Sequence, residues 1–448
     1  MDKLFGTDGI RAVAGDFPLD PAACRTLGRA LVRLLAERRP GRGVLVGRDT
    51  RESGAWIERA LVAGIEDAGG AAALAGVIPT SAVSFLTRTL DFGAGIVISA
   101  SHNPYRDNGI KVFSPQGLKI PGDWESALEA EILAGRGASS SPPGGPDPAR
   151  PSDPGFGEEY IAFLRSRLSL PSRPSARIVV DCANGASSAF APRVLRELGW
   201  EVDALHCAPD GRNINEGCGS LHPESLAARV RATGAAAGIA YDGDADRSVW
   251  VDETGAVLNG DHTLYILARR MKEAGRLRSG RVVATTMSNM GLEKALERSG
   301  IGLLRTRVGD KYVYEEMVRS GANLGGERSG HTILLDDGPT GDGILTSLRL
   351  LEVMAETGLP LSALRAGFEE YPQILVNVPV RAKLPLEGIP EVREAIRRAE
   401  RALAAAGRLD VRYSGTESLA RIMIEGPDEG LIERIARELA AVVTDRLG

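Results

Sequence analysis

"GVLVGRD" at residues 43–49, followed by "SGAWIERALVAGIEDAG" at 53–69, decides the predicted fold. The first segment is a short apolar run with a polar end, which is typical of a buried strand. The second has apolar residues at helical spacing and ends at a glycine, which is typical of a helix. "GAGIVISA" at 93–100 predicts another buried strand. Strand and helix patterns in this alternation favour largely parallel sheets covered by helices.

The same alternation continues along most of the chain. Further strands are predicted at 177–181, 201–206, 238–242, 281–287 and 302–308, with helices between them near 189–198, 223–233 and 261–275, a hairpin at 248–258, a polar loop at 325–331 and a helix near 341–357. Residues 372–448 instead have an α+β order, with strands in ILVNVPV, LDVRYS and ARIMIEG and helices near 390–406 and 428–446. Three α/β units of similar size indicate an approximate internal duplication, although no sequence repeat is visible.

A proline-rich stretch interrupts the pattern after the first unit. Residues 135–157 contain six prolines and no aliphatic side chain larger than alanine, so we expect a flexible surface connector there. The predicted fold class is α/β, with three similar domains of mixed sheets covered by helices and a smaller α+β C-terminal domain. The predicted domains are residues 1–150, 156–254, 255–368 and 369–448.

Composition narrows the class of protein. The chain has 448 residues, 43% of them hydrophobic, and a net charge of -5, so no global basic field favours a nucleic acid or anionic membrane partner. The sequence has no run long enough to span a bilayer, and MDKLFGTDGIRA lacks the apolar segment of a signal peptide. Four scattered cysteines match no CxxC motif and indicate a reducing compartment. We therefore expect a cytoplasmic protein.

The segment YDGDADR, residues 241–247, holds three alternating carboxylates. Asp242, Asp244 and Asp246 repel one another unless a cation lies between them, and hard oxygen ligands suit Mg²⁺ or Ca²⁺. A solvated acidic turn is the competing interpretation. An EF-hand is excluded, because Arg247 stands where that loop needs glycine and strand patterns flank the segment. Arg247 either neutralises the cluster or holds a phosphate beside the metal.

A second polar segment, RYSGTESLAR at 412–421, has the composition of an anion site. Ser414, Gly415 and Thr416 offer closely spaced N–H groups and hydroxyls, and Arg412 and Arg421 flank them. A hairpin turn with solvated arginines is the alternative.

The polar loop GERSGH, residues 326–331, holds Glu327 and Ser329 between two glycines, and His331 follows the second glycine. Glutamate accepts hydrogen bonds and serine can both donate and accept, so such a loop can bind sugar hydroxyls. A polar surface turn is the alternative.

The stretch ISASHNPYRDNGIK, residues 98–111, turns abruptly from apolar to polar and predicts a functional loop rather than a core segment. Ser101 and His102 are adjacent, which rarely aligns an imidazole on that hydroxyl, and no GxSxG motif supports a hydrolase. No P-loop and no strand leading into GxGxxG are present, which argues against a kinase. A hydroxyl near a metal, a histidine and Lys111 favours phosphoryl transfer.

Taken together, these segments resemble the α-D-phosphohexomutase family over essentially the full chain. SASHNP is similar to its phosphoserine loop, DGDADR to its metal loop, GERSGH to its sugar loop and RYSGTESLAR to its phosphate loop. FGTDGIR at 5–11, RVGDKYV at 307–313 and the length most resemble the branch that acts on glucosamine phosphates. Arg328 stands where that branch commonly has glutamine.

The resemblance implies roles for particular residues. Ser101 would carry the phosphoryl group, and one Mg²⁺ per chain would be bound by phosphorylated Ser101 and the three loop aspartates. The remaining implied residues are Arg11, His102, Lys111 and Arg247 around the transferring group, with Lys111 as general acid/base; Glu327 and Ser329 on the sugar; and Arg412, Ser414, Gly415, Thr416 and Arg421 on the phosphate that is not reacting.

The resemblance also implies a reaction. Phosphorylated Ser101 would convert glucosamine 6-phosphate to glucosamine 1-phosphate through a 1,6-bisphosphate intermediate and so supply UDP-N-acetylglucosamine synthesis. Four domains would surround a central cleft, with the last one mobile, and the protein would form a homodimer. The alternatives are a phosphomannomutase/phosphoglucomutase with the same mechanism, a sugar-phosphate phosphatase, and a sensor without activity.

Overall fold

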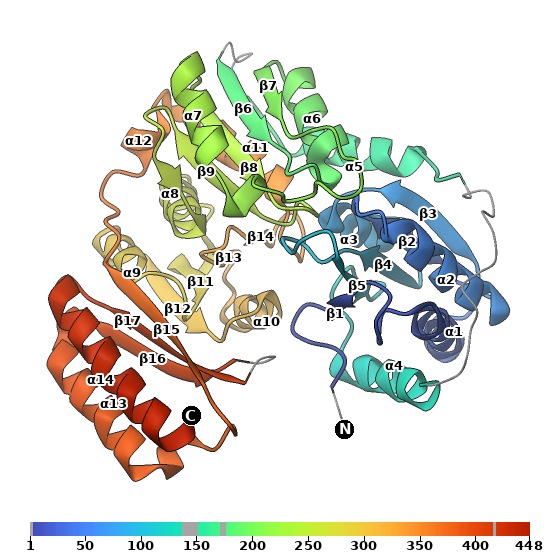
Figure 1. The fold of residues 1–448 in the computed structure, drawn as a ribbon. Coiled ribbons are helices and arrows are strands. Elements are labelled where there is room, and N and C mark those ends of the chain that lie inside the picture. Colours follow the sequence, from blue (N-terminus) through green and yellow to red (C-terminus); the bar gives the residue numbers. More distant parts are fainter. Residues whose placement is uncertain (1–2, 137–150, 171–175, 415–417) are drawn as a thin grey trace.

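The computed structural model describes residues 3–136, 151–170, 176–414 and 418–448. Four units, here called domains I to IV after their four sheets, follow one another along an arc from the blue N-terminal part to the red C-terminal part (Figure 1). Among the described residues, no helix combines the length and the apolar character that crossing a bilayer requires.

Domain I is a mixed sheet in the order β1-β5-β4-β2-β3, whose elements are β1 (Ile10–Val13), α1 (Pro21–Arg38), β2 (Val44–Arg48), α2 (Gly54–Asp67), β3 (Ala72–Val77), α3 (Thr80–Thr89), β4 (Ala94–Ile98), β5 (Asp107–Phe113) and α4 (Gly122–Ala134). Val44 and Val46 face the core under α1 and α2, whereas Leu45 faces the core under α3, as the two-residue period of a strand requires. Gly64 lets α1 and α2 touch, because a Cβ there would lie 1.9 Å from the Arg25 carbonyl oxygen.

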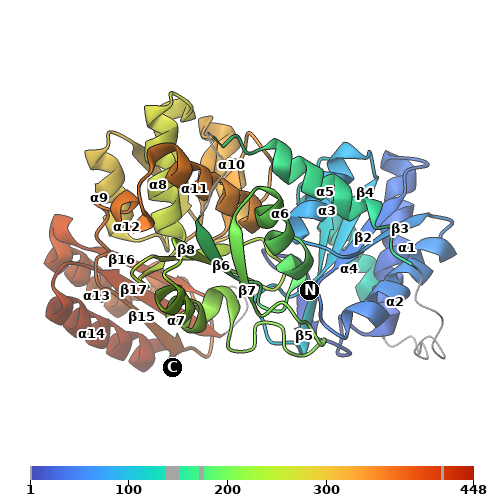
Figure 2. The same cartoon turned by 90° about the horizontal axis from the view of Figure 1, so that it is seen from above.

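Domain II repeats this design in the order β10-β9-β8-β6-β7, with α5 (Gly155–Ser166), β6 (Arg177–Asp181), α6 (Ala191–Glu197), β7 (Glu201–Leu205), α7 (Glu224–Thr233), β8 (Ala237–Tyr241), β9 (Ser248–Asp252) and β10 (Val257–Leu258). Strands β9 and β10 form the predicted hairpin. Helix α5 lies between α3 of domain I and α6 (Figure 2), where the Phe163 ring stacks on Phe85 at 4.2 Å.

Domain III has the sheet order β12-β11-β13-β14, with α8 (Gly260–Glu273), β11 (Arg281–Thr285), α9 (Met290–Arg298), β12 (Gly302–Thr306), α10 (Asp310–Ser320), β13 (Leu324–Gly326), β14 (Thr332–Leu334), α11 (Gly343–Thr357) and α12 (Leu361–Leu364). Helix α11 packs on both α8 and β9, so domains II and III share one hydrophobic core.

Domain IV is smaller and has a core of its own. Its antiparallel sheet β15-β17-β16 is covered by two helices, and the elements are β15 (Gln373–Pro379), α13 (Pro390–Leu403), β16 (Arg408–Tyr413), β17 (Leu419–Glu425) and α14 (Glu429–Leu447). The predicted fold class is confirmed, whereas the exact residue boundaries between domains stay predictions.

One wiring pattern occurs in all three α/β sheets. In each sheet, a central strand (β2, β6 or β11) pairs in parallel with both of the two strands that follow it in the sequence. The later of those two (β4, β8 or β13) then pairs antiparallel with the next strand along the chain (β5, β9 or β14). The predicted duplication is therefore confirmed at the level of topology. The loops 99–106, 242–247 and 327–331, which carry three of the four predicted motifs, join the third strand to the fourth in every unit.

Two predictions about local structure are wrong. The stretch 98–111 does contribute to a core, because β5 begins at Asp107 and buries Ile110. The predicted connector ends in packed structure: the Asp153 N–H donates to the Leu74 carbonyl of β3 at 2.9 Å, and α5 begins at Gly155. Residues 137–150 of that connector lie outside the described residues.

Candidate active site

Ser101 lies at the point where domains I and II meet. Its backbone has a positive φ of 54°, and its hydroxyl donates to Asp242 Oδ2 at 2.6 Å. Its carbonyl oxygen accepts from Arg51 Nη2 at 3.2 Å and from Asn215 Nδ2 at 2.9 Å. The strained conformation is thus held by one residue of each domain, and it aims the hydroxyl at the carboxylates.

The three aspartates predicted to bind a metal are buried together. One carboxylate oxygen from each of Asp242, Asp244 and Asp246 lies within 4.8 Å of the other two. Asp244 Oδ1 and Asp246 Oδ1 are buried without a hydrogen-bond partner. Because buried oxygens left unpaired cost free energy, this donor set fits a hard divalent cation such as Mg²⁺. Strands β8 and β9 flank the loop, as the exclusion of an EF-hand requires.

Lys111 supplies a positive charge to the same cluster from β5. Its ammonium lies 2.8 Å from Asp244 Oδ2, 3.1 Å from Asp246 Oδ2 and 3.1 Å from Asp8 Oδ2. Burial alone would lower the pKa of Lys111, but these carboxylates outweigh it and raise the pKa well above its usual value. Lys111 is therefore protonated and positively charged at neutral pH.

His102 lies beside two guanidinium groups. Arg247 Nη1 is 2.7 Å from His102 Nδ1, which therefore accepts, and Ser101 Oγ is 3.4 Å from the same atom. Burial, then Arg247 and Arg11, lower the pKa of His102 to about 4. The imidazole is thus neutral at physiological pH and acts as a hydrogen-bonding group beside the hydroxyl.

A cavity of about 590 Å³ opens next to these residues. Its lining comes from domains I, II and III and includes Asp8, Arg11, Asn103, Asp246, Arg247, Asp310, Glu327 and His331. Most of the predicted site residues of the first three domains therefore lie at one cavity or directly behind its wall.

The loop 327–331 presents its members differently. Glu327 lines the cavity and accepts from the Gly309 N–H at 3.1 Å, while Ser329 is exposed. His331 is almost fully buried, with Nδ1 3.7 Å from Asp246 Oδ1 and Nε2 accepting from the Gly341 N–H. Arg328 turns toward Glu370 at 3.3 Å and is absent from the cavity lining.

The described residues of the phosphate loop, Arg412, Ser414 and Arg421, belong to domain IV and are not among the residues that line this cavity. Arg412 and Arg421 stand directly opposite each other on β16 and β17. Like charges directly opposite each other on a strand pair are destabilising, and the Asp410 carboxylate, 3.2 Å from Arg412 Nε, offsets part of this charge. Ser414 is buried, and its carbonyl accepts from Lys383. Gly415 and Thr416 lie outside the described residues.

Several residues of this region were not predicted from the sequence. Lys119 joins domains I and III, because its ammonium lies 2.6 Å from Asp8 Oδ1 and 2.7 Å from Asp310 Oδ1. Thr80, at the start of α3, donates from its hydroxyl to Asp244 Oδ2 at 2.6 Å. Asp8 and Asp310 fall within FGTDGIR and RVGDKYV, so these two segments held the only available signal.

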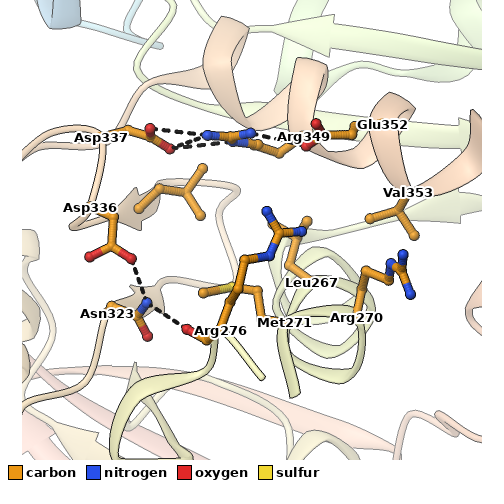
Figure 3. A pocket seen from close by; sticks show the side chains of 11 residues that line it. Leu267, Arg270, Met271, Arg276, Asn323, Asp336, Asp337, Arg349, Glu352 and Val353 are labelled. Carbon is orange, nitrogen blue, oxygen red and sulfur yellow. Dashed lines mark hydrogen bonds and ion pairs between the residues drawn. The ribbon is translucent and has the colours of Figure 1, made fainter. Parts of the chain in front are cut away.

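A second, smaller cavity of about 80 Å³ lies between α8 and α11 (Figure 3). Arg349 bonds both carboxylate oxygens of Asp337 and also Glu352, and Asn323 bonds Asp336. Asp337 and Glu352 are thus both paired by Arg349 at the wall of this cavity.

Comparison with known proteins identifies the family. Models of the phosphoglucomutase/phosphomannomutase family match in order: α/β/α domain I at residues 2–137, domain II at 158–255, domain III at 259–371 and the C-terminal domain at 375–442. The chain belongs to this family. It is accordingly a phosphohexomutase, an enzyme of the isomerase class.

Curated relatives place it within one branch of the family. The phosphoglucosamine mutase of Koribacter versatilis is 49% identical over 100% of this chain and 99% of its own length. The phosphoglucosamine mutase of Moorella thermoacetica is also 49% identical, over 99% of this chain and 100% of its own length. Among solved structures, a phosphoglucomutase/phosphomannomutase family protein of Burkholderia thailandensis superposes with a TM-score of 0.81 at 26% identity, covering 99% of this chain and 97% of its own. The resemblance seen in the sequence is confirmed.

Proposed function

We propose that this phosphohexomutase interconverts glucosamine 6-phosphate and glucosamine 1-phosphate through a phosphorylated Ser101 and a 1,6-bisphosphate intermediate. The observation that carries the proposal is the hydroxyl of Ser101, held 2.6 Å from the buried carboxylate of Asp242 beside a cavity lined by three domains. The 49% identity to phosphoglucosamine mutases supports the amino sugar, and the product would supply UDP-N-acetylglucosamine synthesis.

Asp242, Asp244 and Asp246, together with the phosphate on Ser101, would hold one Mg²⁺. The ion would supply stabilisation of the negative charge on the transferring phosphoryl group. A serine phosphoester cannot donate a hydrogen bond, so phosphorylation of Ser101 removes the bond to Asp242 and frees that carboxylate for the cation. Activity therefore requires both the phosphate on Ser101 and the metal.

The transfer itself uses the groups around Ser101. The bond between Ser101 Oγ and phosphorus breaks as the sugar hydroxyl oxygen bonds to phosphorus. The Lys111 ammonium would give a proton to the serine oxygen and take up the proton that the sugar hydroxyl releases, so it ends the step protonated. Arg11, His102 and Arg247 position the phosphoryl oxygens. The second half of the cycle runs the same steps in reverse from the other end of the sugar.

Recognition of the rest of the substrate falls to two further loops. Glu327, Ser329 and His331 would bind the sugar side of the cavity, with His331 acting through Asp246. Arg412, Ser414, Gly415, Thr416 and Arg421 would hold the phosphate that is not reacting, since Arg412 and Arg421 lie opposite each other on one face of the sheet and two guanidinium groups suit a phosphate. A cytoplasmic location and a homodimer stay predictions, and light scattering of the eluted protein tests the dimer.

The decisive experiment supplies glucosamine, glucose and mannose 6-phosphates side by side and follows both the 1-phosphate product and inorganic phosphate. We expect the highest kcat/KM with glucosamine 6-phosphate and no net release of phosphate. Preference for mannose or glucose 6-phosphate would replace the proposal with a phosphomannomutase/phosphoglucomutase, and stoichiometric phosphate release would replace it with a phosphatase.

A further inference from the structure

A second cluster of ligand-type side chains lies in domain II, away from the three loop aspartates. Asp181 ends β6, His206 directly follows β7, and Cys218 lies further along the same connection. One ligand atom from each lies within 4.8 Å of the other two. Strands β6 and β7 are parallel neighbours, so their carboxyl ends meet at one edge of the sheet and bring the residues together.

The geometry of the cluster favours an ion over direct pairing. His206 Nδ1 lies 3.0 Å from Asp181 Oδ2 but in poor hydrogen-bond alignment, so this buried nitrogen has no well-formed partner. The Asp181 carboxylate is held in place by the N–H groups of Ala183 at 2.8 Å and Gly219 at 3.0 Å. Such supporting bonds orient metal ligands, and they leave further lone pairs on both oxygens.

We propose that Asp181, His206 and Cys218 bind a divalent transition ion of the Zn²⁺ class, with water as the fourth ligand. Oxygen, nitrogen and sulfur together suit Zn²⁺, whereas a thiolate does not suit Mg²⁺ or Ca²⁺. His206 is one-third exposed, with 33% of its side chain accessible, which gives the ion a path from solvent. On binding, Cys218 releases its thiol proton to solvent and no electron is transferred.

The ion would stabilise the loop 206–218, which contacts the backbone of the Ser101 loop. His206 and Cys218 stand at the two ends of a loop whose Asn215 donates to the carbonyl oxygens of Ser101 at 2.9 Å and Asn103 at 3.1 Å. Tying both ends of that loop to β6 fixes Asn215 against the Ser101 loop. The role is structural, and it does not depend on which sugar the enzyme converts.

Cobalt titration of the full-length chain tests this site. After chelation, Co²⁺ is added while the thiolate-to-cobalt absorption band is followed, and Zn²⁺ is then added to displace it. We expect one equivalent per chain to produce the band. Cobalt at Asp242, Asp244 and Asp246 does not contribute, because that cluster contains no sulfur.

Matched variants assign the ligands. Cys218→Ser should lose the band, whereas Cys24→Ser, a buried thiol in α1 of domain I, should keep it. His206→Gln should weaken Co²⁺ binding at least about tenfold, whereas His222→Gln, an exposed histidine nearby, should not. Because His206 is partly exposed, this variant remains a test even if Cys218→Ser folds poorly.

The melting temperature measures Zn²⁺ binding independently of the cobalt absorption band. Zn²⁺ should raise the melting temperature of the wild type more than that of His206→Gln, since an ion that binds only the folded state stabilises it and any binding at the three loop aspartates is common to both proteins. Absence of a sulfur-dependent band in the wild type would overturn the proposal. A band that survives in Cys218→Ser but disappears in Cys207→Ser would also overturn it. So would a Zn²⁺-dependent rise in melting temperature that is equal in the wild type and in His206→Gln.

Discussion

A single hydroxyl, that of Ser101, lies at the centre of the proposed chemistry. It is fully buried in the described structure and bonds a carboxylate, with its backbone held from two domains. Predictions about individual side chains therefore concern what carries the phosphoryl group and what positions the carboxylates around it.

Replacing Ser101 by alanine should lower kcat by at least about 10³-fold, because the phosphoryl group loses its covalent carrier. The circular dichroism spectrum should remain that of the wild type. Ser166→Ala, an exposed serine on α5, serves as the control and should keep full activity. Sugar interconversion at near-normal rate in Ser101→Ala would refute the proposed mechanism.

Thr80→Val tests a residue that acts through Asp244. Valine keeps the shape of threonine but removes the 2.6 Å hydrogen bond to Asp244 Oδ2, so the apparent Mg²⁺ affinity should fall about 10-fold. Magnesium titration of activity measures this, and kcat should recover at saturating Mg²⁺. Thr89→Val on the same helix loses only a bond to the Phe85 carbonyl and should behave as wild type. Equal Mg²⁺ affinity in both variants would exclude the positioning role.

At the scale of helices and strands, the N-terminus of α11 contains a titratable group. Asp342 caps this helix by accepting from the Leu345 N–H at 2.9 Å, and the Tyr160 hydroxyl donates to both of its oxygens. Burial raises the pKa of Asp342 to about 6, so the folded state holds the proton more tightly than the unfolded state.

The stability that this proton contributes is present below about pH 4 and is lost as the pH rises through about 6. The loss is on the order of 3 kcal/mol for a shift of this size. Asp342→Asn cannot ionise, so the melting temperature of the wild type should fall relative to the variant between pH 4 and 7. Asp428→Asn, at the exposed cap of α14, should follow the wild type. Parallel pH curves for the wild type and Asp342→Asn would contradict the prediction.

Periodic elements were predictable from the sequence, and elements that break the local rules were not. Strand β2 and helix α2 follow from apolar spacing alone. Strand β5 was missed because it buries Asn108 and Lys111, whose polarity only tertiary contacts explain. Helix α5 was missed because the prolines before it suggested disorder. Thr80 could not be assigned, since its partner Asp244 lies 164 residues away and no local pattern connects them.

At the scale of the whole molecule, domain IV carries its arginines on a separate core outside the cavity formed by the other domains. It contacts domain III through polar groups such as Arg408, which donates to the Ser288 carbonyl at 3.0 Å, and Glu425, which accepts from the Met290 N–H at 3.2 Å. We predict that domain IV approaches the cavity when Arg412 and Arg421 bind a phosphate on the sugar.

Small-angle scattering should therefore show a smaller radius of gyration when glucosamine 6-phosphate is added, because the anion draws the opposed arginines toward the cavity. Arg412→Ala removes half of that charge and should raise KM while reducing the compaction. Arg434→Ala, on the helix α14 of the same domain, is the control. An unchanged radius with saturating substrate would show that the phosphate is held without domain movement.

The shared wiring of the first three sheets has a practical consequence. Each of the loops 99–106, 242–247 and 327–331 is anchored at both ends by strands whose pairing does not depend on what the loop contains. Segments from other phosphohexomutases could thus be grafted at residues 327–329, with His331 kept because its Nδ1 lies 3.7 Å from Asp246 Oδ1. Such exchanges would show whether the preference for one hexose over another follows this short segment.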